Sequence, residues 1–321
     1  MRSVDRSAHP PAPSEDGATK NTGESPATGC LQELSAVFPA PTQGRVYNFL
    51  NGGKDAYVTE RALGKALKRI FPGISEVTRE NRLCVNERVP NYLAEEGFGQ
   101  YLDLGCGMPD EPLLHRAVQG VVPEARVAYM DHDPTVLVHA RSAYGSWPGL
   151  TVVEADVWNI DGLLRHPDLR ELIDLDQPAV VVAGAVLHFA PDETVKRVVD
   201  DLAAGLAAGS VLVLSHVTGD GVAEEDVAKA KELYEKYVSP IYLRSEEEIQ
   251  DLLGGRRMIA GLCRTYELLP QHPDDVALAR NVEGAPHFYA GIVELSPGPE
   301  RGMAVSAARR EGTATHRRGM R

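Results

Sequence analysis

The chain has 321 residues, of which 43% are hydrophobic and 25% charged, the proportions of an ordinary globular protein. That length suits one large domain or two small ones. A formal net charge of −13 disfavours nucleic acid or an anionic membrane as the main partner. The four cysteines stand far apart without a Cys-x-x-Cys pair, which argues against a disulfide framework or a zinc site and suits a reducing cytoplasm.

The two ends of the chain differ in composition from its middle. Residues 1–40 are rich in Pro, Gly, Ser and Thr, and we expect a disordered leader there, whereas the small and basic residues 297–321 predict a flexible tail. The longest apolar stretch, residues 178–190, is too short to span a bilayer, and no secretory signal is apparent. Between the ends we predict a helical cap over residues 41–97 and a main domain over residues 98–296.

The predicted cap consists of helices that come before the first strand. The first runs into Gly52-Gly53, the second ends at Phe71-Pro72-Gly73, and Pro90 is expected to kink or split the third. The expected helices cover residues 45–51, 57–70 and 75–96. Their small and polar residues either close over a ligand or serve only as helix caps and solvated surface, and residue types alone leave both readings open.

The rest of the chain alternates between strand and helix patterns, which predicts a mainly parallel sheet with helices on both faces. The last two strands are expected to form an antiparallel hairpin at the sheet edge. A charged helix over residues 222–237 carries Val227, Leu233, Tyr234 and Tyr237 on its apolar face. The predicted strands are residues 100–104, 125–130, 151–155, 179–186, 211–217, 258–268 and 287–295, and the other helices are residues 113–122, 135–143, 191–206 and one opening at Ser245.

A glycine-rich turn, Asp103-Leu-Gly105-Cys-Gly107, follows the first strand. The dinucleotide fingerprint requires a third glycine where this chain has Asp110, whose negative charge does not suit a pyrophosphate. A carboxylate two residues before the first glycine instead suits a cationic ligand such as a methionyl ammonium. A glycine turn without any ligand is the alternative.

Further polar residues follow the other predicted strands. Asp131, 24 residues after Gly107, is placed to accept hydrogen bonds from ribose hydroxyls, and Asp156 from an adenine amino group, with the Val157 backbone beside it. His188 follows the fourth strand. Any one of these could be an ordinary loop residue, but acids in phase with three strands indicate a nucleoside site at the carboxyl edge of the sheet.

Together, several motifs resemble one bacterial methyltransferase family, long catalogued as a domain of unknown function and classed as S-adenosylmethionine-dependent. The resemblance covers roughly residues 41–295 and implies a class I, Rossmann-like α/β fold with a mostly parallel seven-stranded sheet, an antiparallel edge hairpin and an N-terminal helical cap. The motifs are Arg45-Val-Tyr-Asn-Phe-Leu-Asn-Gly-Gly-Lys-Asp55, Asp103-Leu-Gly-Cys-Gly-Met-Pro109, Tyr129-Met-Asp-His-Asp-Pro134, Val153-Glu-Ala-Asp156, Val186-Leu-His-Phe189 and Leu214-Ser-His216.

The resemblance also implies roles for matching residues. S-adenosylmethionine is the implied cofactor and S-adenosylhomocysteine its product. Asp103, Gly105 and Gly107 would hold the methionine end, Asp131 the ribose and Asp156 the adenine, while the backbone from Ala185 to Leu187 would flank the methyl group. The remaining expected cofactor contacts are His132, Val157 and the cap residues Tyr47, Asn48, Gly53, Lys54, Arg79 and Asn81.

Methyl transfer needs a general base only if the acceptor must lose a proton. His188 is the first candidate because imidazole titrates near neutral pH, and Tyr57, Tyr47 and His216 are weaker ones. A structural role for His188 as a loop hydrogen-bonding group is equally open. The histidines are scattered, and Asp131 with Asp133 cannot form a metal site alone, so no metal is expected.

Three functions remain open from the sequence. The first is a methyltransferase acting on a small molecule, and the second is a non-catalytic protein that binds S-adenosylmethionine as a sensor or partner. The third is an NAD-dependent oxidoreductase, which Asp110 disfavours; a nucleic-acid methyltransferase is disfavoured by the lack of a basic stripe. Leu269-Pro-Gln-His-Pro273 replaces the Trp-Arg-Pro-like element expected of the family, which predicts a change in acceptor choice if this loop lines the pocket.

Overall fold

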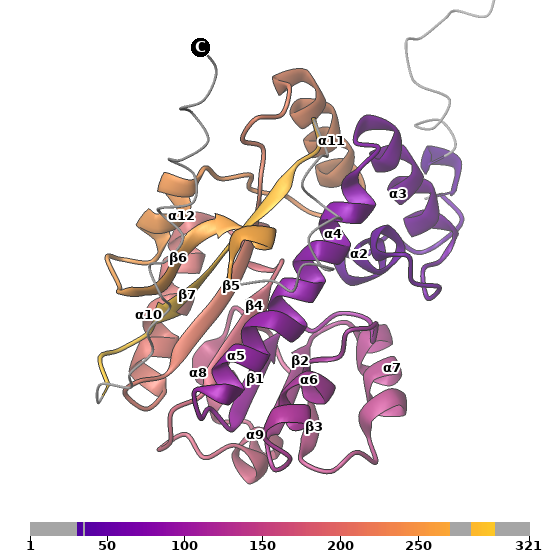
Figure 1. The fold of residues 1–321 in the computed structure, drawn as a ribbon. Helices are drawn as coiled ribbons and strands as arrows, with labels where there is room; N and C mark the ends of the chain where they lie inside the picture. Colours follow the sequence, from indigo (N-terminus) through magenta and orange to yellow (C-terminus); the bar gives the residue numbers. More distant parts are fainter. Residues whose placement is uncertain (1–30, 35, 270–283, 299–321) are drawn as a thin grey trace, which may run out of the picture.

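The computed structural model describes residues 31–34, 36–269 and 284–298. The predictions for most of the leader, for the tail beyond residue 298 and for the loop over residues 270–283 therefore lie outside the described residues. Within the described part, strands and helices alternate from residue 100 onward, as predicted (Figure 1).

A single seven-stranded sheet, in the order β3-β2-β1-β4-β5-β7-β6, forms the centre of the described structure. The first five strands pair in parallel, while β7 runs antiparallel to both of its neighbours, β5 and β6. This arrangement confirms the predicted class I methyltransferase fold with its antiparallel edge. The strands are β1 Gln100–Leu104, β2 Arg126–Asp131, β3 Leu150–Glu154, β4 Val180–Gly184, β5 Val211–Thr218, β6 Met258–Arg264 and β7 His287–Glu294.

Helices cover both faces of the sheet, which explains why its central strands are almost continuously apolar. Side chains alternate between the faces along each strand, so that Leu102 and Val181 join one core and Tyr101 and Val180 the other. One face packs against α8 Ile160–Leu164, α9 Pro167–Leu172, α10 Asp192–Gly205 and α12 Glu246–Leu252, and the other against α5 Val89–Glu95, α6 Leu114–Val121 and α7 Pro134–Tyr144.

The N-terminal helices precede the sheet, as predicted; the first two of them lie beside α11 (Glu224–Tyr237) at one end of the sheet, whereas α5 packs on its face (Figure 1). Leu63 and Leu67 share an apolar cluster with Tyr234 and Tyr237 of α11. The third predicted helix is split in the neighbourhood of Pro90, which has no N–H to donate to the preceding turn. Its parts are α4 Ile74–Leu83, a π-helical turn Cys84–Arg88 and α5, and they follow α2 Gln43–Asn51 and α3 Val58–Ile70.

Some boundaries differ from the predicted ones for local reasons. Strand β4 ends at Gly184 rather than residue 186, because Ala185 adopts a left-handed conformation with φ of 57°. The 3-10 turn Leu187–Phe189 follows it. Strand β6 ends at Arg264, and a 3-10 turn over Thr265–Glu267 replaces the last residues of the predicted strand.

Candidate functional site

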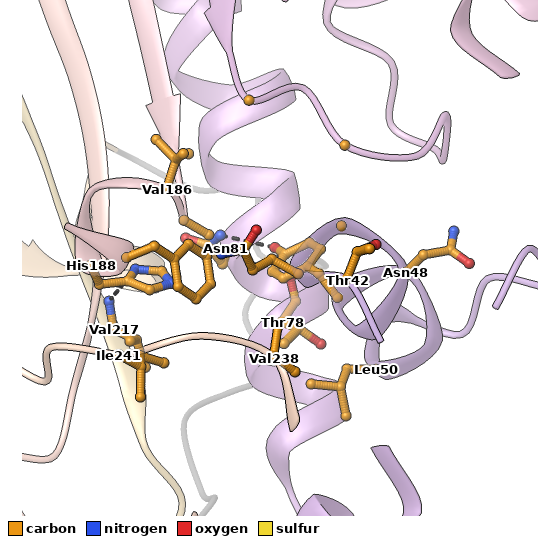
Figure 2. Close-up of a pocket in the computed structure, with 18 of the residues that line it drawn as sticks. Thr42, Asn48, Leu50, Thr78, Asn81, Val186, His188, Val217, Val238 and Ile241 are labelled. Atoms are coloured by element: carbon orange, nitrogen blue, oxygen red, sulfur yellow. Dashed lines mark hydrogen bonds between the residues drawn. The ribbon is translucent and has the colours of Figure 1, made fainter. Parts of the chain in front are cut away.

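A cavity of about 620 Å³ lies where β1, β2 and β4 end, between the sheet, the N-terminal helices and α11 (Figure 2). Its position agrees with the rule that ligands bind outside the carboxyl ends of parallel strands. One part of its wall is formed by the glycine turn and the strand-end acids, and another part by apolar side chains of the helices. The two parts have different chemistry.

The glycine turn brings backbone, rather than side chains, to the cavity. Gly105 and Gly107 have φ of +66° and +65°, a conformation that glycine adopts without steric cost. A Cβ on Gly105 would lie 2.8 Å from Val186 Cγ2, so no larger residue fits without a shift. Helix α2 approaches the same turn, since a Cβ on Gly44 would lie 3.5 Å from Gly107 Cα. The turn can therefore present its backbone closely to a ligand beneath α2.

Asp131, at the end of β2, connects this turn to the next one. Its Oδ2 accepts a hydrogen bond from Gly107 N at 3.0 Å, and its Oδ1 accepts from the backbone N–H groups of His132 and Asp133 at 2.8 and 3.0 Å. Asp133 in turn caps α7 by accepting from Thr135 N at 2.8 Å. The carboxylate of Asp131 is thus held in one orientation at the cavity wall.

Asp103 is a buried carboxyl group beside the glycine turn, only 5% exposed. Burial raises its pKa from the ordinary 3.8 to about 7, against the opposing effect of the Arg82 guanidinium and with a smaller contribution from Asp131. The side chain of Arg82 donates two hydrogen bonds to the Asp110 carbonyl, at 3.0 and 2.6 Å. A cationic group bound here would favour the ionised carboxylate, which is the environment that a ligand's ammonium requires.

A buried ion pair attaches the N-terminal helices to this part of the site. Arg45 Nε of α2 lies 2.7 Å from Glu60 Oε1 of α3, and Arg45 Nη1 lies 3.3 Å from Asp133 Oδ2. Glu60 is fully buried and also accepts from Tyr57 N at 3.0 Å. The helices that close the cavity are therefore connected directly to the loop after β2.

The other part of the cavity is apolar and was not predicted as a site. Its walls come from α2, α3, α4, α11, the segment after α11 and the strand β7. The sequence signal for it was the predicted apolar face of α11, since an apolar helix face must pack against something and the sequence analysis assigned it no partner. The apolar residues lining this part are Leu50, Leu67, Phe71, Ile74, Val77, Phe189, Val227, Ala230, Tyr234, Val238, Ile241, Leu243 and Phe288.

A short hydrogen-bonded chain crosses from α2 to α4 at the cavity wall. The Tyr47 hydroxyl donates to the Thr78 carbonyl at 2.9 Å and accepts from Asn81 Nδ2 at 2.9 Å. Burial raises the pKa of Tyr47 to about 12, despite the opposing hydrogen bond from Asn81, so this hydroxyl stays protonated at neutral pH. The remaining amide atom, Asn81 Oδ1, is buried without a hydrogen-bond partner.

His188 lies on the sheet side of the cavity and is 3% exposed (Figure 2). Its Nδ1 accepts from Val217 N at 3.5 Å. Burial, followed by the effects of His216 and Arg244, holds its pKa well below the ordinary 6.5. The ring is therefore neutral, and with Nδ1 accepting, its proton is on Nε2. This geometry favours a hydrogen-bond donor over the general base predicted from the sequence.

Arg244, which the sequence analysis did not identify, supports the segment that carries His188. Its guanidinium donates to the Ala190 carbonyl at 2.7 Å, to Asp192 Oδ1 at 2.7 and 3.0 Å, and to His216 Nε2 at 2.9 Å. His216 Nδ1 lies 2.8 Å from the Val217 carbonyl. Since a guanidinium only donates and a carbonyl only accepts, His216 is fixed in its Nδ1–H form.

The structure brings many of the sequence-predicted residues together at this cavity. Those from the sheet come from the ends of different strands, and those from the cap come from α2 and α4. Figure 2 shows Asn48 and Asn81 on the helical side and His188 opposite them. The predicted residues that line the cavity are Tyr47, Asn48, Asn81, Asp103, Gly105, Gly107, Asp131, His132, Val157, Ala185 and His188.

The cap residues Gly53, Lys54, Tyr57 and Arg79 lie outside this lining. Gly53 packs against the Asn48 side chain just after the left-handed end of α2, which is the capping interpretation. Arg79 Nε donates to the Asn51 carbonyl at 3.1 Å. Tyr57 is 51% exposed, and its ring lies against the Arg45 guanidinium at 4.9 Å.

Two predicted residues of the sheet edge also lie outside the lining. Asp156 Oδ1 accepts from Trp158 N at 3.0 Å in a local turn, while its neighbours Val157 and Trp158 line the cavity. The Leu187 side chain is buried in the core beneath the sheet edge.

Among the described residues, no group of His, Cys, Asp or Glu side chains is placed to hold a metal ion.

Comparisons with known proteins identify the family of the chain. A crystal structure of a proposed methyltransferase from Thermobifida fusca YX is 33% identical, covers 82% of this chain and 98% of its own, and superposes with a TM-score of 0.74. A DUF574 family protein from Streptomyces avermitilis MA-4680 is 30% identical, with 80% and 98% coverage and the same TM-score. No curated protein matches the chain.

The family model described as S-adenosyl methyltransferase matches residues 35–295. That range contains the glycine turn, the strand-end acids, the N-terminal helices and α11. It confirms the family predicted from the motifs and argues against the oxidoreductase. The chain belongs to the S-adenosyl methyltransferase family, whose enzymes use S-adenosylmethionine as the methyl donor.

Proposed function

We propose that this methyltransferase acts on a small-molecule acceptor that binds in the apolar part of the cavity. The observation that carries the proposal is the continuity of one cavity between the glycine turn and the apolar walls of α3 and α11. A donor held at the first part and an acceptor held at the second would share one enclosed space. The net charge of −13 also disfavours a nucleic-acid acceptor.

The residues at the polar end fit the donor. Burial raises the pKa of the Asp103 carboxyl group to about 7 even with Arg82 nearby, and the ammonium of a bound ligand would favour its ionised form. Gly105 and Gly107 leave room for the amino-acid portion, and Asp131 would accept hydrogen bonds from ribose hydroxyls. Val157 provides a buried apolar surface for the adenine.

When bound, S-adenosylmethionine would supply an electrophilic methyl group on a sulfonium: an acceptor lone pair would bond to the methyl carbon in line as the carbon–sulfur bond breaks and S-adenosylhomocysteine leaves. The protein's contribution is to hold donor and acceptor collinear and close together, and reactions between groups oriented in this way can show effective molarities of ~10⁵ M or more. Helices α2, α3 and α11 form part of the wall of that space. Tyr47 stays protonated and His188 Nδ1 is occupied by Val217 N, so we assign both side chains an orienting role rather than proton removal.

Calorimetric titration with S-adenosylmethionine, S-adenosylhomocysteine and NAD tests this function. We expect binding of the first two in the micromolar range, weakened at least tenfold by Asp131→Ala, because the substitution removes a fixed hydrogen-bond acceptor. Asp161→Asn, in an exposed ion pair far from the cavity lining, is the matched control and should bind normally. Binding of NAD alone would overturn the proposal.

A further inference from the structure

The apolar part of the cavity has a composition that selects against charged acceptors. The charged residues that line the cavity are Arg82, Asp103, Asp110, Asp131 and Asp133, which gather around the glycine turn and the loop after β2, and Lys231 of α11, whose side chain is 47% exposed and lies 3.8 Å from Glu235. That ammonium belongs to the solvent-facing side of α11. A charged acceptor would lose its hydration among Leu67, Phe71 and Tyr234 without gaining an ionic partner there, which is strongly unfavourable.

Two buried side-chain oxygens of the cavity lining, Asn81 Oδ1 and Thr42 Oγ1, lack a hydrogen-bond partner among the described residues, and the Asn81 amide is the one whose orientation its neighbours fix. The only proton of the Tyr47 hydroxyl is donated to the Thr78 carbonyl, so its oxygen must accept from Asn81. The NH₂ group of Asn81 therefore faces Tyr47, and its Oδ1 is left without a partner. Asn81 is 1% exposed and lines the cavity. Because a buried amide oxygen without a hydrogen bond costs free energy, a ligand with an N–H or O–H group there would be favoured.

A hydrogen-bond donor faces the same space from the sheet side. The Nδ1 edge of His188 is turned toward Val217 N, and the neutral ring therefore presents Nε2–H from its other edge (Figure 2). Two neighbours keep the His188 ring in place: Arg244 donates to the Ala190 carbonyl just after it, and the ring of His216 lies 5.4 Å from the His188 ring, centroid to centroid. Asn81 and His188 thus provide one acceptor and one donor on opposite sides of the cavity.

We propose that the acceptor is an uncharged, largely apolar molecule with a hydroxyl group that donates to Asn81 Oδ1 and accepts from His188 Nε2–H. A hydroxyl is the smallest group that does both. Tyr47 acts as a positioning residue, because it fixes which atom Asn81 presents. This substrate class rests on the proposed function, since it assumes that the donor occupies the polar end of the cavity.

Binding of three rigid probes to the full chain saturated with S-adenosylhomocysteine tests the proposal. The probes share one ring system: 2-naphthol is neutral with a hydroxyl, 2-methoxynaphthalene lacks the proton, and 2-naphthoate is charged. We expect 2-naphthol to bind about tenfold or more tightly than either of the others, the factor expected for one buried hydrogen bond. Titration calorimetry or naphthol fluorescence gives the dissociation constants.

Three variants separate the contacts from general damage. Asn81→Leu should reduce the preference for 2-naphthol over 2-methoxynaphthalene to less than threefold, while affinity for S-adenosylhomocysteine stays within threefold. Tyr47→Phe should reduce the preference partially, because the amide can then rotate. Asn51→Leu is the matched control: its Oδ1 is also buried without a partner, but it lies outside the cavity lining, and the preference should persist.

The outcomes distinguish this proposal from the proposed function. Failure of S-adenosylhomocysteine to bind the unmodified protein would refute the function itself. If it binds but 2-naphthoate binds as well as 2-naphthol, or none of the probes binds, the substrate class is wrong. If Asn81→Leu weakens S-adenosylhomocysteine and leaves the naphthol preference unchanged, Asn81 belongs to the donor end and the proposal is overturned.

Discussion

The buried ion pair between Arg45 and Glu60 provides the sharpest test of how the N-terminal helices are held. Glu60→Gln keeps the size of the side chain and removes its charge. The guanidinium of Arg45, 4% exposed, then loses its anionic partner at 2.7 Å, and the carboxylate that remains beside it is Asp133, at 3.3 Å. We expect a clear loss of stability, because the remaining cation is buried with incomplete compensation.

The magnitude follows from the geometry. Removing one partner of a buried pair typically costs about 3–5 kcal/mol. Since Asp133 remains and Arg45 keeps part of its compensation, the lower end applies, and we expect the free energy of unfolding to fall by about 3 kcal/mol. At roughly 2–4 °C per kcal/mol for a chain of this size, the melting temperature should fall by about 6–12 °C.

Thermal and urea unfolding followed by circular dichroism measure this change. Asp161→Asn is the matched control, because Asp161 and Arg165 form a pair at 2.8 Å with side chains 66% and 77% exposed. Exposed pairs contribute little, so the control should lose less than about 0.5 kcal/mol. Equal losses in the two variants, or a Glu60→Gln protein as stable as the original, would refute the reasoning.

Three further predictions concern the cavity wall. Gly105→Ala should lower the free energy of unfolding by about 2–4 kcal/mol, because strain at positive φ adds to the steric contact with Val186. Gly107→Ala should lower it by about 1 kcal/mol, because the added Cβ meets only Gly44 Cα, at 3.9 Å; equal losses in urea unfolding would contradict this. The pKa of Asp103 is about 7 in the folded protein and an ordinary 3.8 in the unfolded chain, so the stability of the ligand-free protein should fall as pH rises between these values. Unfolding measured from pH 4 to 8 should show that fall in the original protein and not in Asp103→Asn. Arg244→Lys should cost about 1–3 kcal/mol, since an ammonium cannot replace a guanidinium fork that reaches several acceptors; unchanged urea unfolding would show that the fork is dispensable.

The sheet and the polar end of the cavity were accessible from the sequence, because both depend on local signals. Short apolar runs that alternate with helical patterns identified the strands, and Asp103 and Asp131 stand near strand ends in phase with the topology. Parallel strands necessarily bring their carboxyl ends to one edge. The positions of residues far apart in the chain could therefore be inferred without knowing any side-chain contact.

Features set by packing could not be inferred in this way. The short helices α8 and α9 were not predicted, because five and six residues are too few to show a helical period. The apolar part of the cavity lies where α3 packs against α11, and no local sequence pattern predicts that contact between distant helices. Likewise, the functions of Tyr47 and Asn81 depend on a hydrogen bond across 34 positions of sequence.

The position of β7 has a consequence for synthesis of the chain. Strand β7, formed by His287–Glu294, is the last strand in sequence among the described residues, yet it pairs with β5 on one side and β6 on the other. During translation, β5 and β6 therefore have open hydrogen-bonding edges until those residues emerge from the ribosome. Open strand edges invite association between nascent chains. A ribosome that stalls before residue 287 should leave an aggregation-prone product rather than a slightly shortened enzyme.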